Sequence, residues 1–224
     1  MTALLVVLTI IIAVAVDVLV VARRQRRAHI QVVEEVVPMT DPRVPQGIFL
    51  DRTHGWARIT AEGTLRVGID DLLAQAVGSV DGVEMPARGA RIKRGDPLVT
   101  LKVRGRSLVV PSPVEGEVVS LNDQVVERPW LVTRDPYGIG WTVGLWARDL
   151  KEAIRPLRIG SGATAFLRDE MHRLMDFLSM PSHRPDAVPV LADGGVPRRG
   201  ALSTLDEAGW DAFQNEFMST ARER

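Results

Sequence analysis

The side chains that could do chemistry are few and lie far apart along this chain. There is no cysteine, and lysine occurs only at Lys93, Lys102 and Lys151. Disulfides, thiolate metal sites, iron–sulfur ligation and a cysteine nucleophile are therefore excluded. The histidines have no metal-ligand spacing, because they are scattered as His29, His54, His172 and His183.

Other catalytic patterns are also missing from the sequence. Ser107, Ser112 and Ser120 lack a Gly-x-Ser-x-Gly context, and there is no phosphate-binding glycine loop. Asp70 and Asp71 are adjacent, yet neighbouring residues at a helix start do not face each other, and the helix dipole explains acidic residues there. We therefore expect no catalysis, no metal and no cofactor, and we interpret His54 and Trp56 as packing and hydrogen-bonding residues.

Length and charge narrow the class of protein further. A chain of 224 residues allows one well-buried domain with extensions. Its 28 basic and 28 acidic residues balance, which argues against a general polyanion-binding surface, so we expect no nucleic-acid partner.

Residues 1–28 predict a membrane anchor. Residues 3–22 are apolar except for Thr9 and Asp17, and twenty helical residues span about 30 Å, the hydrocarbon thickness of a bilayer. The basic cluster follows the apolar run, at Arg23, Arg24, Arg26 and Arg27, which is the reverse of a signal peptide. The positive-inside rule then predicts a single span in the cytoplasmic membrane, with the N-terminus outside and the remaining chain in the cytoplasm.

Asp17 is the one ionisable group within this apolar run. Such groups often face a partner helix, which makes Asp17 a candidate interaction residue. Asp17 also lies within two turns of the cytoplasmic end, where headgroups, water and Arg24 are within reach. Both interpretations stay open.

The middle of the chain predicts a mainly β domain. Residues 29–46 contain Pro38, Pro42 and Pro45 and are interpreted as a stiff linker. Residues 47–150 then show short β-rich runs separated by Gly, Pro, Asn and Asp, with a short helix at 70–76. Many short strands at close spacing favour a small β-sandwich or flattened barrel.

Two helices are expected in the C-terminal part. We expect residues 151–180 to form a helical extension with apolar side chains at helical spacing, and residues 181–202 to form a disordered linker rich in Pro and Gly. Residues 203–224 predict an amphipathic helix capped by Ser203 and carrying Trp210, Phe213 and Phe217. Whether these helices pack on the chain's own β domain or on another protein stays open.

Residues 47–150 resemble the glycine cleavage H protein, which has the lipoyl-domain type of fold. Several blocks carry the resemblance in the same order and spacing, namely His54-Gly55-Trp56 and residues 64–70, 77–80, 84–86, 95–97, 113–118 and 135–141. In the family, a lysine at a hairpin, within Glu-Ser-x-Lys-Ala, carries the lipoyl group. The ungapped spacing from Gly95 to Gly116 implies that Gly105 stands at that position, between Arg104 and Arg106.

Glycine has no amine to acylate, although it suits a hairpin because it accepts positive φ. The resemblance therefore implies a lipoyl-like domain without the lipoyl group. We expect a non-catalytic accessory or scaffold subunit of an electron-transfer, photosynthetic or transport complex, with Arg104, Arg106 and the C-terminal aromatic residues meeting its other subunits. The alternatives are a lipoyl or acyl carrier that uses Lys102 or Lys93, and a periplasmic adaptor of the membrane-fusion type.

Overall fold

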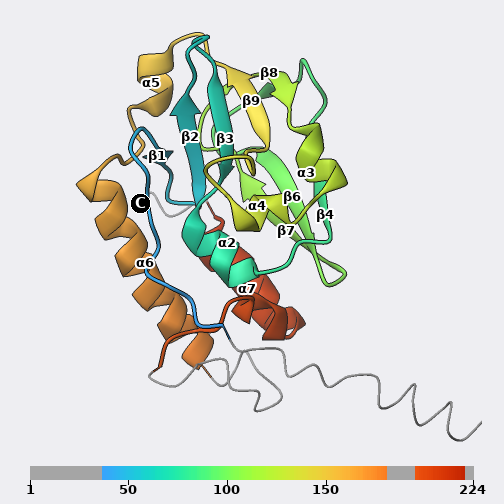
Figure 1. The fold of residues 1–224 in the computed structure, drawn as a ribbon, viewed down its shortest axis with the longest axis vertical. Coiled ribbons are helices and arrows are strands. Elements are labelled where there is room, and N and C mark those ends of the chain that lie inside the picture. The colour runs from blue at the N-terminus through green and yellow to red at the C-terminus, as the bar shows by residue number, and fades with distance from the viewer. Residues whose placement is uncertain (1–36, 181–194, 220–224) are drawn as a thin grey trace, which may run out of the picture. The chain divides into compact units, whose positions relative to one another are not determined.

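The computed structural model describes residues 37–180 and 195–219 (Figure 1). The predicted anchor, with Asp17, and the first part of the predicted linker lie outside these residues. Among the residues described, no helix is long and apolar enough to cross a membrane.

Two antiparallel sheets form the centre of the fold, which is mainly β as expected. The first has six strands in the order β1 (Phe49–Leu50), β2 (Gly55–Ile59), β3 (Leu65–Ile69), β9 (Val143–Trp146), β8 (Gly116–Leu121) and β5 (Arg91–Ile92). The second has three strands in the order β4 (Gly82–Glu84), β6 (Pro97–Val103) and β7 (Arg106–Pro111). The period-2 runs in the sequence correspond to most of these strands, whereas β1 and β4 are too short to show a pattern.

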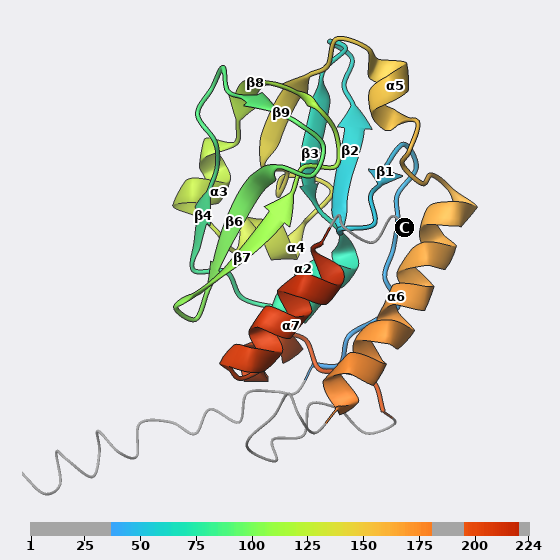
Figure 2. The same ribbon diagram turned by 180° about the vertical axis from the view of Figure 1, so that it is seen from behind.

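Helices surround the two sheets. In chain order they are α2 (Asp71–Val77), α3 (Asp123–Glu127), α4 (Leu131–Arg134), α5 (Leu150–Ile154), α6 (Ser161–Ser179), the 3-10 helix η2 (Ala201–Thr204) and α7 (Glu207–Phe217). Helix α2 begins at Asp70, whose side chain accepts a hydrogen bond from the Leu73 amide, as an N-cap does. Figure 2 shows α6 on the side of the β domain opposite α3, and α7 crossing in front of α2.

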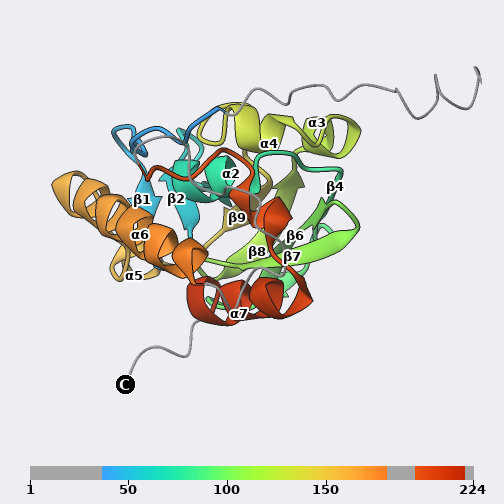
Figure 3. The same cartoon turned by 90° about the horizontal axis from the view of Figure 1, so that it is seen from below.

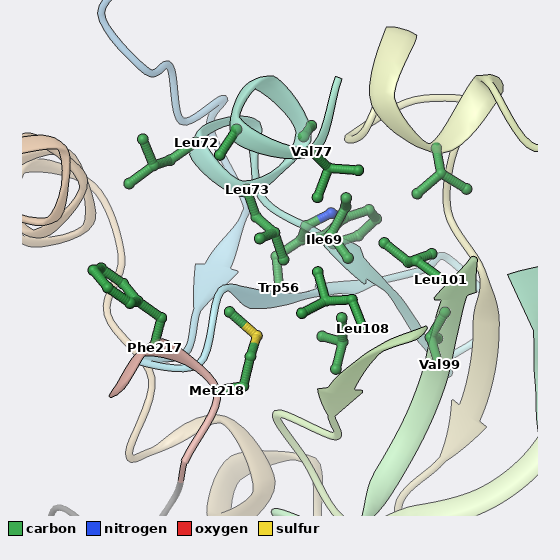
Figure 4. Packing of buried hydrophobic residues seen from close by; sticks show 14 of the residues in the cluster. Trp56, Ile69, Leu72, Leu73, Val77, Val99, Leu101, Leu108, Phe217 and Met218 are labelled. Atoms are coloured by element: carbon green, nitrogen blue, oxygen red, sulfur yellow. The ribbon is translucent and has the colours of Figure 1, made fainter. Parts of the chain in front are cut away.

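Trp56 lies at the centre of the core, between α2 and the sheets (Figure 4). Its indole N–H donates to the carbonyl of Pro136 at 3.1 Å, so the buried ring keeps a polar partner. A Cβ at Gly68, directly across the strand pair, would lie 2.9 Å from the indole, so glycine is needed there to make room for the ring. Phe217 and Met218 reach the same core from the end of α7.

The described parts of the two predicted linkers, residues 37–46 and 195–202, pair with each other along the domain. The Met39 amide donates to the carbonyl of Pro197 at 2.8 Å, and Pro38 and Arg198 form an antiparallel bridge. Met39 itself is buried. Prolines exclude helix and central strand, but they do not prevent two extended segments from pairing with each other at an edge.

The start of the C-terminal helix also needs correction. Ser203 lies in η2, where its hydroxyl donates to the carbonyl of Gly200. The N-cap of α7 is Asp206, which accepts from the Gly209 amide at 2.7 Å. Ser203 and Asp206 are both good capping residues, and the sequence spacing did not distinguish between them.

Candidate functional site

The β6–β7 hairpin ends in a two-residue turn. Val103 pairs with Arg106, and the turn residues Arg104 and Gly105 have φ of 47° and 80°. Two successive residues with positive φ define the type I′ turn, which matches the twist of the flanking strands. A Cβ at Gly105 would meet nothing within 4 Å, so the turn projects into open space. The position that the resemblance assigns to the carrier lysine is therefore at an exposed turn, but it carries no side chain.

Neither lysine proposed as an alternative carrier lies in this turn. Lys102 is in β6, where its ammonium group contacts Glu84 Oε1 at 3.1 Å and donates to Ser107 Oγ at 3.0 Å. Lys93 follows β5, and its amide donates to Asp96. Lys102 is directed along the strand surface, so acylating it would first require breaking these two contacts.

Arg106 connects the hairpin to the C-terminal segment. Its guanidinium donates to the carbonyl of Leu205 at 2.7 Å and lies 4.9 Å from the ring centroid of Trp210. Longer contacts reach the carbonyls of Ser203 and Asp206, each at 3.4 Å. Arg106 is therefore engaged within the chain.

Helix α7 also covers the free edge of β7, which is the outer strand of the three-stranded sheet. The Trp210 indole N–H donates to the carbonyl of Ser107 at 3.1 Å, and the Val109 amide donates to Gln214 Oε1 at 3.2 Å. Trp210 and Gln214 are one helical turn apart, so one face of α7 satisfies alternate backbone groups of the strand. A covered edge cannot pair with a strand of another chain.

These positions change our expectation for the candidate interaction residues. Trp210, Phe213 and Phe217 are each at most 3% exposed, because they pack into the chain's own core. A surface for another subunit cannot include them while α7 is docked. Arg104 lies in the turn, and its amide donates to Asp81 Oδ2 at 2.6 Å.

A buried cluster of charges lies where α6 meets the β domain. His54 Nδ1 is 2.8 Å from Asp70 Oδ2, and His54 Nε2 is 3.6 Å from Glu170 Oε2. His54 is 2% exposed and adopts a φ of 63°, which is unusual for a residue with a side chain. The rings of Phe166 and Phe217 lie 6.0 and 6.2 Å from the imidazole.

The two carboxylates decide the protonation of His54. Burial alone would lower the pKa of the imidazole, but the charge and hydrogen bond of Asp70, with those of Glu170, outweigh burial and raise this pKa to about 10. Burial acts to raise the pKa of Glu170, while His54 and Arg173 bring it below its usual value. His54 is thus a buried imidazolium at neutral pH.

Arg173 extends this cluster to α7. It donates twice to the Glu170 carboxylate, at 2.7 and 2.9 Å, and once to the backbone carbonyl of Glu216 at 2.7 Å. Its guanidinium also lies 4.2 Å from the ring centroid of Phe217. The cluster therefore links the residue before β2, the start of α2, α6 and α7, and its geometry is that of a structural ion network. An apolar void lined by His54 and six other side chains adjoins the cluster, with room for about one water molecule.

The sequence singled out His54 but not its partners on the helices. Glu170 and Arg173 have the i,i+3 spacing of a helical ion pair, which was the available signal. Of the other histidines, His172 is exposed on α6, while His29 and His183 lie outside the described residues. Among the residues described, no group of His, Asp and Glu could hold a metal ion.

Two antiparallel sheets, a buried His-x-Trp segment and an exposed hairpin turn are the features of a lipoyl-type carrier domain. The glycine cleavage H-protein family model matches residues 49–170, which is more than half of the chain. The chain therefore belongs to the glycine cleavage H-protein family.

Relatives of this family align with the chain over most of their own length. A probable glycine cleavage system H protein of Pyrococcus abyssi is 28% identical over 59% of this chain and 98% of that protein. The glycine cleavage system H protein of Rubrobacter xylanophilus is 34% identical over 50% of this chain and 89% of that protein. The fold resembles the crystal structure of a glycine cleavage system H protein from Mycobacterium marinum, with a TM-score of 0.50 and 23% identity over 57% of this chain and 98% of that one.

The family match ends at residue 170, within α6. The second half of α6, η2 and α7 are therefore additions to the family domain. Through Arg106 and Arg173, these additions are fixed to the hairpin and to the charge cluster around His54.

Proposed function

We propose that this chain is a non-catalytic accessory subunit of a membrane complex, in which the H-protein-like domain binds other subunits and carries no lipoyl group. The observation that carries the proposal is the hairpin turn itself. An attachment site needs an amine on an exposed turn, and the exposed turn here consists of Arg104 and Gly105.

The surroundings of the turn also favour a fixed surface. Arg106 and Trp210 join the hairpin to α7, so the region that would carry a mobile arm is braced by an added helix. Anchoring is supported by residues 3–22, whose length and apolar composition suit a bilayer span, and by the arginine cluster that follows them. We place the domain on the cytoplasmic face for that reason.

Mass spectrometry tests the absence of a lipoyl group. The full chain is co-expressed with a lipoate-attaching enzyme and lipoate, and its intact mass is measured. We expect the unmodified mass, while the Pyrococcus abyssi H protein under the same conditions serves as the control for active attachment. A lipoyl adduct on the wild-type chain would overturn the proposal.

The second candidate is a lipoyl or acyl carrier, which the similarity to glycine cleavage system H proteins favours. It requires an amine other than the family's, and Lys102 and Lys93 are the nearest ones. An adduct that disappears in Lys102→Arg but persists in Lys93→Arg would assign the carrier role to Lys102. The reverse pattern would assign it to Lys93.

The side of the membrane on which the domain lies and its assembly with other subunits need separate measurements. A cytoplasmic reporter fused to the C-terminus should be active, whereas activity of a periplasmic reporter would favour an adaptor of the membrane-fusion type. In native gels of detergent-solubilised membranes from the source organism, we expect migration well above the mass of one chain. Migration as a lone monomer would contradict an accessory subunit.

A further inference from the structure

Large apolar side chains gather at one exposed corner of the domain, which comprises residues 122–141 and is called the α3–α4 corner. Nine large apolar side chains are exposed in the described part of the chain. Three of them belong to this corner, with Val126 at 52%, Trp130 at 48% and Ile139 at 51%. Such side chains are ordinary when single, but a group of them on one surface marks a contact site.

Hydrogen bonds hold the corner together as one unit. Asn122 Nδ2 donates to the carbonyls of Ile139 and Trp141 at 2.8 and 2.6 Å, and thereby ties the loop after α4 to the start of α3. Asp135 accepts from the Ile139 amide at 2.9 Å. The inward-facing residues are already buried, namely Val125, Leu131, Val132 and Tyr137. The exposed side chains are therefore the outer surface of a rigid element.

The corner lies on the side of the domain where the described chain begins. The Val37 carbonyl accepts from the Arg199 amide at 2.8 Å, and the following residue, Gly200, abuts Gly78. The Gly78 carbonyl in turn accepts from Thr133 of α4 at 2.9 Å. Figure 3 shows the chain from residue 37 onward on the same side as α3 and α4, with α7 on the opposite side. Val37 is itself 49% exposed.

The connection to the predicted anchor is short. Nine residues, 28–36, separate Arg27 from Val37, and a fully extended chain of that length spans at most about 32 Å. If residues 3–22 cross the bilayer, this length limits how far Val37 can lie from Arg27 at the headgroups. A tether of this length gives an effective concentration in the millimolar range, so a weak contact with lipid suffices.

Charge indicates which kind of lipid the corner suits. The corner has two basic residues, Arg128 and Arg134, against three acidic ones, Asp123, Glu127 and Asp135, so it has no excess of positive charge to attract anionic headgroups. Arg134 lies 5.8 Å from the ring centroid of Trp130. Tryptophan is the side chain that prefers the boundary between headgroups and acyl chains, where its ring is half solvated.

We propose that the α3–α4 corner is a membrane-contacting surface, which inserts Trp130, with Val126 and Ile139, into the interface of an uncharged or zwitterionic bilayer. The inference rests on the proposed membrane anchor. It adds an orientation, in which the corner faces the lipid while the edge of the domain that carries α7 and the hairpin faces away. That edge is then accessible to other subunits.

The test uses the full chain in nanodiscs of phosphatidylcholine with brominated acyl chains, which quench tryptophan fluorescence at the interface. Trp146 provides a matched control, because it is 51% exposed but lies in β9 of the six-stranded sheet, outside the α3–α4 corner. We expect the wild type to be quenched, Trp130→Phe to lose most of that quenching, and Trp146→Phe to keep it. Circular dichroism checks that both variants keep the fold, which two exposed conservative changes should not disturb.

Each other outcome overturns the inference. Quenching that is absent from the wild type, or that persists in Trp130→Phe, would mean that Trp130 does not contact lipid. Quenching that falls equally in both variants would mean that the contact is not specific to the α3–α4 corner. Alkaline extraction of cell membranes that contain the full chain separates the two proposals. A chain that stays in the membrane but shows no Trp130 quenching contradicts only the contact, whereas a chain that is released contradicts the anchor and the contact together.

Discussion

The Arg106 guanidinium lies 4.9 Å from the ring centroid of Trp210 and donates to the neighbouring Leu205 carbonyl at 2.7 Å. An arginine of the hairpin thus holds the added C-terminal helix, although we predicted from the sequence that it contacts another subunit. A charge reversal at this position would therefore weaken the packing of α7, whether or not it also weakened binding to another subunit.

Removal of this contact should loosen α7. We expect Arg106→Ala to lower the free energy of unfolding by about 1–3 kcal/mol, because a charged donor and a cation–π contact are lost. Hydrogen exchange should rise in residues 201–217 and stay unchanged in β2 and β3. Arg91→Ala is the control, since Arg91 is exposed and no side-chain partner of it is found in the described part of the chain. Unchanged exchange in α7 would show that Arg106 does not hold it.

The His54 cluster should make stability depend on pH. The pKa of His54 is raised to about 10 in the native state, against about 6.5 for a free imidazole. The native protein therefore keeps a proton that the unfolded chain releases, so this contribution is complete below about pH 6.5 and is lost as the pH rises to about 10. Glu170 does not alter this range, because its lowered pKa affects stability only at acid pH.

Urea unfolding at a series of pH values, from neutral to alkaline, measures this slope. His54→Asn is the matched variant, because asparagine tolerates a positive φ and its amide can still donate to Asp70. We expect the variant to be less stable at neutral pH and to show a flatter dependence. Equal slopes in both proteins would remove His54 as the titrating group.

Arg173 should matter far more than an exposed arginine with the same helical spacing. Loss of its side chain in Arg173→Met leaves the Glu170 carboxylate partly buried with one partner fewer, which should cost about 3 kcal/mol. Arg155 pairs with Glu152 at the same i,i+3 spacing, but its side chain is 74% exposed, so Arg155→Met should cost less than about 0.5 kcal/mol. Similar losses by chemical denaturation in both variants would contradict a buried ion network.

Alanine substitutions at two glycines with similar φ separate the cost of backbone strain from the cost of a steric clash. Gly63 and Gly78 have φ of 77° and 73°, but an added Cβ would meet nothing within 4 Å at Gly63 and would lie 2.6 Å from the Gly200 Cα at Gly78. Gly63→Ala should cost about 1 kcal/mol for the positive φ alone. Gly78→Ala should cost clearly more and should increase hydrogen exchange in residues 195–204. Equal costs would mean that this segment is not held against α2.

Gly105→Lys addresses the hairpin directly. The turn projects into open space, so the substitution should leave the fold intact and cost about 1 kcal/mol through the positive φ alone. Circular dichroism shows whether the variant is folded, and thermal unfolding followed by the same signal measures its loss of stability. A chain that no longer folds would show that the turn depends on glycine more strongly than its surroundings indicate.

Local patterns were sufficient for the β domain and for the hairpin. Alternating apolar residues marked most of the longer strands, and Asp70 marked the start of α2. The resemblance to the H-protein family implied that Gly105 lies at a hairpin, and its glycine suits the positive φ that the turn has there. These features depend on neighbours a few residues apart, so the sequence determines them by itself.

Only the tertiary structure decided what the polar and aromatic residues of the tail contact. His54 meets Glu170, and Arg106 meets Leu205, across 116 and 99 residues of chain respectively. An amphipathic helix has the same sequence whether its apolar face packs on its own domain or on another protein. The location of Phe213 and Phe217 therefore depended on which surface was left uncovered by the two sheets, a property of the assembled fold.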